Sequence, residues 1–177
     1  MMRKGLALIV LAAMVPALSA CGLKPLYAGA GSPAVTQGLA AVDVPAIEGR
    51  AGWLVRNAIN EKLSAAGSQN PRYRLDIRLD DTLQGLGILG DDTIGRERRT
   101  LRARYQLVDI ASDAILLDAT AGADAGIDVV SSEYATIAAE QRALENLSTE
   151  IADRIVTRVA LTLRSRETDG SAAPVQP

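Results

Sequence analysis

Arginines are concentrated in two segments of the chain in which charged and apolar residues alternate. One segment covers residues 72–78 and the other covers residues 96–104. The planar guanidinium group of arginine donates paired hydrogen bonds to phosphate or carboxylate oxygens, so rows of arginines can bind an anionic ligand. The candidate anion-binding residues are Arg72, Arg74, Arg78, Arg96, Arg98, Arg102 and Arg104.

A β-hairpin would bring these two rows side by side. Alternation with a period of two predicts strands with one buried and one solvated face over residues 72–84 and 96–110. Acidic residues interrupt the positive charge at Asp76, Asp80 and Glu97. Two interpretations are therefore open. The face is either a site for a phosphorylated glycolipid, an anionic headgroup or an acidic protein wall, or a solvated surface with cross-strand ion pairs.

The glycine-rich segment 85–95 is predicted to be a loop between these strands. It lacks the Lys-Ser/Thr pair that completes a phosphate-binding P-loop. We expect its aliphatic residues either to contact a lipid or a protein partner, or to be buried within the loop itself. These residues are Leu86, Ile88 and Leu89.

The remaining elements are predicted from hydrophobic periodicity. A first strand is expected over residues 39–47, with Pro45 placing it at a sheet edge, and a helix over 49–67. A third strand over 114–130 precedes a last helix over 133–164. Trp53, at the start of the first helix, is expected to be a core anchor and not a platform for a ligand. The order β-α-β-β-β-α predicts an α+β fold with two helices packed on one face of a four-stranded mixed sheet.

The composition argues against an enzyme. The chain has no histidine, one cysteine and a formal net charge of −2. Histidine is the usual general base and the commonest zinc ligand, so we expect no metal, no cofactor and no catalytic residues. Catalysis by Ser-Lys or by paired carboxylates stays formally open, although no motif for it is present. The charge balance and the scarcity of aromatic residues also argue against a nucleic-acid partner.

The single cysteine, Cys21, follows a short apolar run that begins after Arg3 and Lys4. This run is too short to span a bilayer and fits a signal peptide. Leu18-Ser19-Ala20-Cys21 resembles a bacterial lipobox, which implies cleavage before Cys21 and acyl chains on it. The expected domains are a signal peptide (1–20), a lipidated tether (21–38), a single α+β domain (39–164) and a disordered tail (165–177).

The mature sequence resembles the lipopolysaccharide-assembly lipoprotein family LptE. The resemblance rests on CGLKPLY at residues 21–27, on the order of the elements, and on the segment SSEYATIAAEQRALENLSTEIADRIVTRVALTLR at 131–164. It implies an outer-membrane lipoprotein, facing the periplasm, that plugs and helps assemble the β-barrel LptD and helps deliver lipopolysaccharide. Direct lipopolysaccharide binding through basic residues is also implied. The alternative is a lipoprotein of an envelope phospholipid-transport complex, which would contain a closed apolar cavity.

Overall fold

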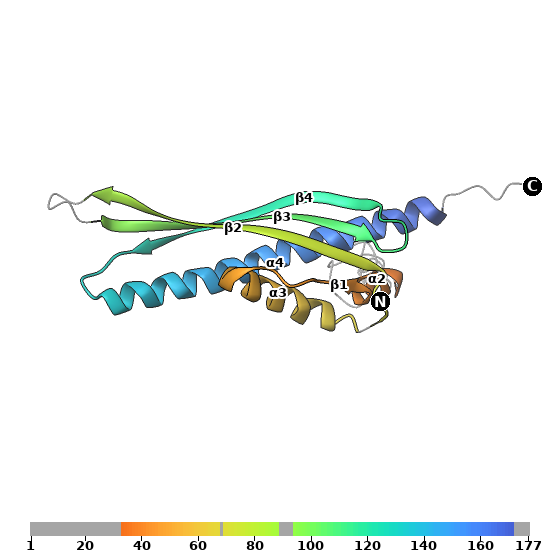
Figure 1. Cartoon of the computed structure of the whole chain (residues 1–177), viewed down its shortest axis with the longest axis horizontal. Helices are drawn as coiled ribbons and strands as arrows, with labels where there is room; N and C mark the ends of the chain where they lie inside the picture. The colour runs from red at the N-terminus through yellow and green to blue at the C-terminus, as the bar shows by residue number, and fades with distance from the viewer. Residues whose placement is uncertain (1–32, 68, 89–93, 172–177) are drawn as a thin grey trace, which may run out of the picture. The chain divides into compact units, whose positions relative to one another are not determined.

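A computed structural model describes residues 33–67, 69–88 and 94–171 of the chain. All of them lie in the unit Ser32–Pro177. Cys21 and Leu89 fall outside the described residues. The elements, labelled as in Figure 1, are α2 (Pro33–Ala40), β1 (Val42–Asp43), α3 (Gly49–Ser64), β2 (Tyr73–Ile88), β3 (Ile94–Asp109), β4 (Ile115–Asp128) and α4 (Glu133–Ser171).

The strands form one mixed sheet in the order β1-β2-β3-β4. Strand β1 is parallel to β2, whereas β2, β3 and β4 form an antiparallel meander. The α+β class, the four-stranded mixed sheet and the predicted order of strands and helices are therefore confirmed. The register places Arg78 opposite Arg104 and Arg102 opposite Gly122, so the two arginine rows adjoin on β2 and β3.

The beginning and end of the domain differ from the prediction. The structure contains a third helix, α2, which includes residues 39 and 40 that were expected to start a strand. Strand β1 has only two residues, because Pro45 follows closely and has no amide hydrogen for a ladder. Helix α4 continues past Arg164 to Ser171.

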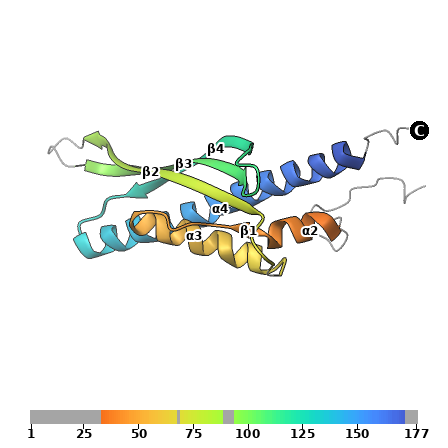
Figure 2. The ribbon, with the colours of Figure 1, turned by 45° about the vertical axis from the view of Figure 1, so that its right-hand side comes forward.

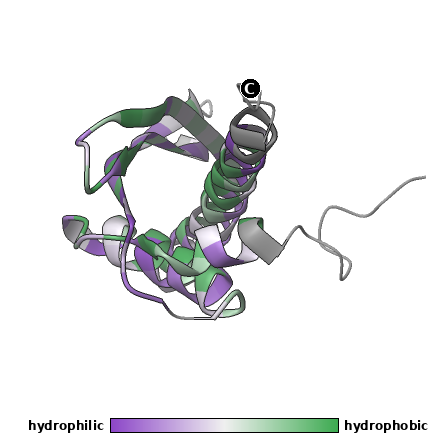
Figure 3. Cartoon of the chain, turned by 90° about the vertical axis from the view of Figure 1, so that its right-hand side faces the viewer, coloured by the Kyte–Doolittle hydropathy of each residue, from purple (hydrophilic) through white to green (hydrophobic). Residues whose placement is uncertain are grey.

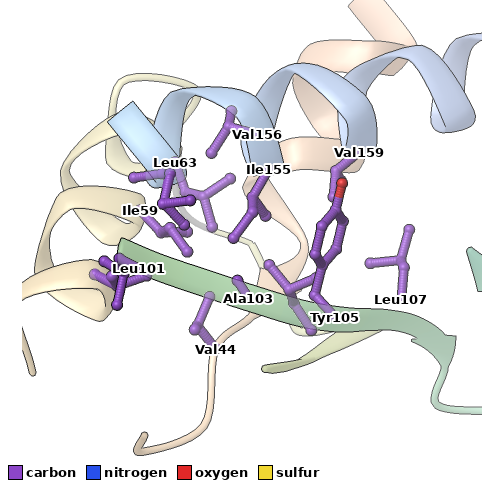
Figure 4. Close-up of a cluster of buried hydrophobic side chains, with 14 of the residues drawn as sticks. Val44, Ile59, Leu63, Leu101, Ala103, Tyr105, Leu107, Ile155, Val156 and Val159 are labelled. Atoms are coloured by element: carbon purple, nitrogen blue, oxygen red, sulfur yellow. The ribbon is translucent and has the colours of Figure 1, made fainter. Parts of the chain in front are cut away.

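One face of the sheet packs against α3 and α4, and the core lies between these layers (Figures 2 and 3). The expected apolar stripe of α4 and the inward row of β3 are both confirmed, since all their members are buried. Figure 4 shows the side chains of β3 pointing at α4. The buried residues of these two rows are Leu101, Ala103, Tyr105, Leu107, Leu144, Leu147, Ile151, Ile155, Val159 and Leu163.

Trp53 is not part of this core, and the prediction that it anchors the core is wrong. Its side chain is 62% exposed on α3, where Gly52, Val55, Ile59 and Leu63 occupy the buried positions. The helix can pack closely at Gly52, since a Cβ there would lie 2.6 Å from the carbonyl oxygen of Ile47. The glycine thus takes the inward position beside Trp53, and the large ring next to it is left facing outward.

The loop between β2 and β3 is shorter than the predicted loop over residues 85–95. Strand β2 continues through Gly85 and Leu86 to Ile88, which pairs with Ile94. Leu86 is half-buried and pairs with Arg96. Gly87 has a φ of +78°, a conformation that L-residues with side chains rarely adopt, which explains a glycine inside this strand.

Ser148 offers a test of the packing between α4 and the rest of the core. Its side chain is 1% exposed, and its hydroxyl oxygen has no hydrogen-bond partner within the described chain. A buried hydroxyl without a partner is unfavourable, so we expect Ser148→Ala to raise the free energy of unfolding by about 1 kcal/mol. Chemical denaturation measures this. Ser165→Ala in the same helix is the control for the helix propensity of alanine, because Ser165 is exposed and its hydroxyl already donates to the carbonyl of Thr162 at 3.0 Å. An equal gain from Ser165→Ala would contradict the explanation.

In the part of the chain that the structure describes, no helix is long and apolar enough to cross a membrane.

Candidate ligand-binding face of the sheet

The face of the sheet opposite the helices carries the arginine rows. Residues that pair across an antiparallel ladder share a face, so the even-numbered residues of β2, β3 and β4 lie on the face opposite the helices. Val108, at the register shift near the end of β3, is even-numbered but buried. This outer face contains Arg74 and Arg78 of β2, and it contains Arg96, Arg98, Arg102 and Arg104 of β3. Arg72 lies just before β2, with its guanidinium 5.2 Å from the ring centre of Tyr73.

The seven arginines do not form one site. Arg72 and Arg96 lie at opposite ends of the hairpin, since Arg96 pairs with Leu86. Fourteen residues of extended strand between positions 72 and 86 correspond to about 45 Å. A single headgroup therefore cannot contact all of them, and the middle of the face must be considered separately from its ends.

Strand β4 supplies a row of carboxylates that the sequence analysis missed. Asp118, Asp124 and Asp128 occupy even-numbered positions of β4 and lie on the same outer face as the arginines of β3. Their spacing by even numbers, in a segment already predicted to be a strand, is a signal that could have revealed them. Because of these carboxylates, positive and negative side chains alternate on the outer face, which is not a purely basic surface. We call this arrangement the charge lattice.

Most of the candidate arginines are engaged in ion pairs. Two close pairs lie toward the middle and the beginning of the hairpin, where nitrogen–oxygen distances are 3.0 Å for Arg104–Asp118 and for Arg74–Asp76. The remaining pairs are looser. Their nitrogen–oxygen distances are 3.3 Å for Arg96–Asp128, 3.8 Å for Arg98–Asp124 and 3.9 Å for Arg72–Asp109. The interpretation with cross-strand ion pairs thus holds for much of this face.

The Arg104–Asp118 pair is also held by hydrogen bonds. Arg104 donates through Nε and Nη2, and Gln106 donates to the same carboxylate at 2.8 Å. The hydrogen bond from Arg104, and then that from Gln106, lower the pKa of Asp118, while the bond to Asp118 raises the pKa of Arg104. Acid therefore releases Arg104 only when the pH falls through the lowered pKa of Asp118.

Arg78 and Arg102 differ from the other five arginines. Neither forms an ion pair or hydrogen bond with another residue in the described portion of the chain. With Arg104 they line two neighbouring surface hollows. The first, of about 500 Å³, lies between β2 and the segment Pro45–Ile47 and includes Arg78 and Arg104. The second, of about 390 Å³, includes Arg78, Arg102 and Arg104. We call these three residues the central arginine cluster.

The two hollows are surface features with charged walls. Neither is the closed apolar cavity that a phospholipid carrier would need. A guanidinium without a carboxylate partner keeps its donors available for the oxygens of a phosphate or carboxylate. The central arginine cluster is thus the part of the outer face best suited to bind an anion.

A further arginine, Arg99, lies on the opposite face and has a structural role. Its Nη2 is 2.6 Å from the carboxylate of Asp81, and its Nη1 donates to the carbonyl of Glu140 in α4 at 3.2 Å. The hydrogen bond with Asp81 raises the pKa of Arg99 above its usual value. This side chain connects the far half of the hairpin to α4, so it is unavailable to a ligand on the outer face.

The described residues contain no cluster of three potential metal ligands among histidine, cysteine, aspartate and glutamate. The carboxylates of the outer face are paired with arginines instead.

The comparisons with known proteins give a family and a fold. The LptE family model, described as lipopolysaccharide-assembly, matches residues 39–159. No match was found among curated proteins.

Several solved structures have a similar fold. A protein from Caulobacter crescentus CB15 that is described as a lipoprotein is 24% identical, with a TM-score of 0.60, and the match covers 73% of this chain and 96% of that one. A minor lipoprotein from Acinetobacter baumannii is 15% identical, with a TM-score of 0.54 and coverage of 68% and 88%. Rare lipoprotein B from Shewanella oneidensis is 10% identical, with a TM-score of 0.53 and coverage of 71% and 99%.

Proposed function

Since the chain belongs to the LptE lipopolysaccharide-assembly family, we propose that it plugs an LptD-type outer-membrane β-barrel, helps it assemble and assists lipopolysaccharide delivery. The family match over residues 39–159 carries this proposal, because it includes the sheet, α3 and most of α4. The family acts in assembly, a task that requires no catalytic residues. The role in lipopolysaccharide assembly follows from membership of the family. That the partner is an LptD-type barrel, and that this chain plugs it, are the parts that we propose.

The charge lattice of the outer face is consistent with a plug. The lumen of a large outer-membrane barrel is polar and contains water. A domain that fills it needs a surface on which both charges are represented and apolar patches are small. The sheet presents such a surface through its alternating arginines and aspartates.

Cys21 gives the proposed membrane attachment. Its acyl chains would hold the domain at the periplasmic side of the outer membrane, since two or more chains anchor a protein stably whereas one chain binds only marginally. The domain would then be confined near the barrel, which raises its effective concentration there.

Lipopolysaccharide binding is assigned to the central arginine cluster. Phosphates of lipid A are suitable acceptors for guanidinium groups, which donate to them in pairs. Arg78 and Arg102 are available in the described structure, and Arg104 is shared with Asp118. The ligand must therefore compete with Asp118 for Arg104. Asp80, which lies opposite Arg102 and lines the same hollow, adds a second negative charge beside the site.

Depletion of the protein tests the proposed function. We expect a large β-barrel protein to co-purify with the lipidated chain from membranes, and we expect its native form and surface lipopolysaccharide to decline together when the chain is depleted. Restoring expression should recover both, whereas a Cys21→Ser variant should recover them less well at the same expression level. Normal maturation of the barrel during depletion would reject the plug and assembly role.

Removing the competing carboxylate should strengthen ligand binding. In Asp118→Asn, Arg104 loses its charged partner and can donate to a phosphate, so we expect the dissociation constant for lipopolysaccharide to fall several-fold in a fluorescence titration. Asp153→Asn is the control, because it removes the same charge from α4, where Asp153 pairs with Lys62 at 2.7 Å. Equal strengthening by both variants would show that only net charge matters.

A further inference from the structure

A third surface hollow, of about 490 Å³, lies where α2, the start of β2 and α4 meet. Its walls come from α2, from the connection between α3 and β2, from the start of β2 and from the C-terminal part of α4, which Figure 1 shows at the same end of the sheet. Hollows of about 300–1,000 Å³ can hold a small ligand. The polar residues that line this one are Gln37, Gln69, Asn70, Arg72, Tyr73 and Arg166.

Backbone contacts hold the walls of this hollow together. The carbonyl of Ala41, just after α2, accepts hydrogen bonds from the amides of Arg72 at 2.8 Å and of Tyr73 at 3.1 Å. Helix α2 also packs closely on α4 at Gly38, where a Cβ would lie 3.1 Å from Cδ1 of Leu163. These contacts join α2 to both β2 and α4, so the shape of the hollow does not depend on a ligand.

Two arginines from different elements give the hollow its positive charge. The exposed side chain of Arg166 in α4 forms no ion pair or hydrogen bond with another described residue. The side chain of Arg72 is 69% exposed and lies 3.9 Å from the carboxylate of Asp109, which also accepts hydrogen bonds from two amides of the following turn. Neither arginine has a close ion pair, so both guanidinium groups keep donors for an anion.

The lining of the hollow also lacks the negative charges found on the outer face. Among the described residues that line it there is no carboxylate, whereas the two hollows of the outer face include Asp76 and Asp80. The amide side chains of Gln37, Gln69 and Asn70 supply further hydrogen-bond donors. Two guanidinium groups with neutral donors around them suit the oxygens of a phosphate group.

The chain that precedes α2 indicates which phosphate reaches this hollow. Twelve residues separate Cys21 from Pro33, where α2 begins. This segment spans at most about 40 Å when fully extended. With the proposed acyl chains on Cys21, α2 and the hollow beside it stay close to the surface of the membrane, where phospholipid headgroups are concentrated.

We propose that this hollow binds the phosphate of an anionic phospholipid headgroup in the membrane that holds Cys21, and that Arg72 and Arg166 are the residues that bind it. The inference rests on the proposed attachment through Cys21 and adds a second ligand to lipopolysaccharide. Arg72 lies six residues before Arg78 on an extended segment, which corresponds to about 20 Å. The hollow and the central arginine cluster are therefore separate sites that can be occupied together.

Flotation with lipid vesicles tests this site without the acyl anchor. The mature chain from residue 21 onward, with Cys21→Ser, should float with phosphatidylglycerol vesicles and much less with phosphatidylcholine vesicles. Adding Arg72→Glu and Arg166→Glu should lower its partition coefficient onto phosphatidylglycerol by about tenfold or more, because each arginine near an anionic surface contributes about a fivefold factor. Circular dichroism should show that the variant is folded, since both substituted side chains are exposed.

Matched charge reversals separate the hollow from the rest of the surface. Arg50→Glu with Arg142→Glu changes two exposed arginines of α3 and α4, and Arg142 lies about 36 Å along α4 from Arg166. This control should float like the parent chain, and so should Arg102→Glu with Arg104→Glu. An equal loss of flotation in either control, or unchanged flotation without the two arginines of the hollow, would overturn the proposal.

Two further measurements identify the source of the phosphate. Inorganic phosphate, at the concentration of the lipid phosphate, should leave the chain on the vesicles, and release of the chain would assign the hollow to free phosphate instead. Arg72→Glu with Arg166→Glu should keep its affinity for lipopolysaccharide, and loss of that affinity would assign the hollow to lipopolysaccharide. Neither acyl chains nor a barrel is present in these assays, so their failure is distinguishable from failure of the proposed function.

Discussion

Ile151→Asp is expected to unfold the domain. Ile151 is fully buried in the middle of α4 and belongs to the hydrophobic core between the helices and the sheet. The substitution removes the apolar contacts of a buried isoleucine, which costs about 2–5 kcal/mol, and places a carboxylate where the core around it is apolar. Domains of this size have a total stability of about 5–15 kcal/mol, so the loss takes most or all of it.

Circular dichroism and thermal unfolding measure this effect. We expect the variant to lose its cooperative transition or to unfold far below the wild type. Asn146→Asp is the matched control, because Asn146 is exposed on the same helix and the substitution adds the same charge. Its effect should stay within about 0.5 kcal/mol. Wild-type thermal stability in Ile151→Asp would refute the assignment of the buried face of α4.

Periodicity was sufficient to predict the parts of the fold in which burial is continuous. The stripe from Leu144 to Leu163 has the spacing of one helix face, and the alternation from Leu101 to Leu107 has that of one strand face. In both elements the core requires an apolar side chain at every inward position. Several residues therefore show the same spacing, which makes the pattern easy to detect in the sequence. The register of β2, β3 and β4 then follows from short connections between neighbouring strands.

Prediction was weaker where tertiary context determines the structure. The sequence places Trp53 among apolar residues of an amphipathic helix, but close packing at Gly52 selects which of the two neighbours faces inward. Residues 39 and 40 have apolar side chains that suit a strand or a helix, and their place in α2 depends on contacts with α3 and α4. Periodicity contains no information on either choice.

The candidate site was predicted in part for the same reason. Alternation placed the arginines of β2 and β3 on one face, and the structure does place them there. Whether carboxylates neutralise these arginines depends on which strand lies beside β3 and on its register. Asp118 could therefore be recognised as the partner of Arg104 only from the structure of the sheet. The sequence therefore predicted a larger basic surface than the structure contains. Because the other candidate arginines form ion pairs, the part of this surface best suited to an anion is the central arginine cluster.

Reversal of two charges in that cluster should abolish most of the proposed lipopolysaccharide binding. The double variant Arg102→Glu, Arg104→Glu loses two guanidinium groups and gains two carboxylates, which repel the phosphates. Hydrogen bonds to charged groups contribute about 1.5–3 kcal/mol each, so we expect affinity to fall by more than tenfold, which corresponds to at least about 1.4 kcal/mol. Titration of the purified full chain with lipopolysaccharide measures the change, and thermal unfolding should show little loss of stability because both side chains are exposed.

Arg96→Glu with Arg98→Glu is the matched control. This pair makes the same charge change on the same strand and face, about 20 Å from the cluster. Its arginines already lie beside Asp128 and Asp124, so they contribute less to an incoming anion. If binding depends on the central arginine cluster, only the first variant loses it. Equal losses in both variants would mean that the whole face acts through its net charge, and unchanged binding in the first would reject this face as the ligand site.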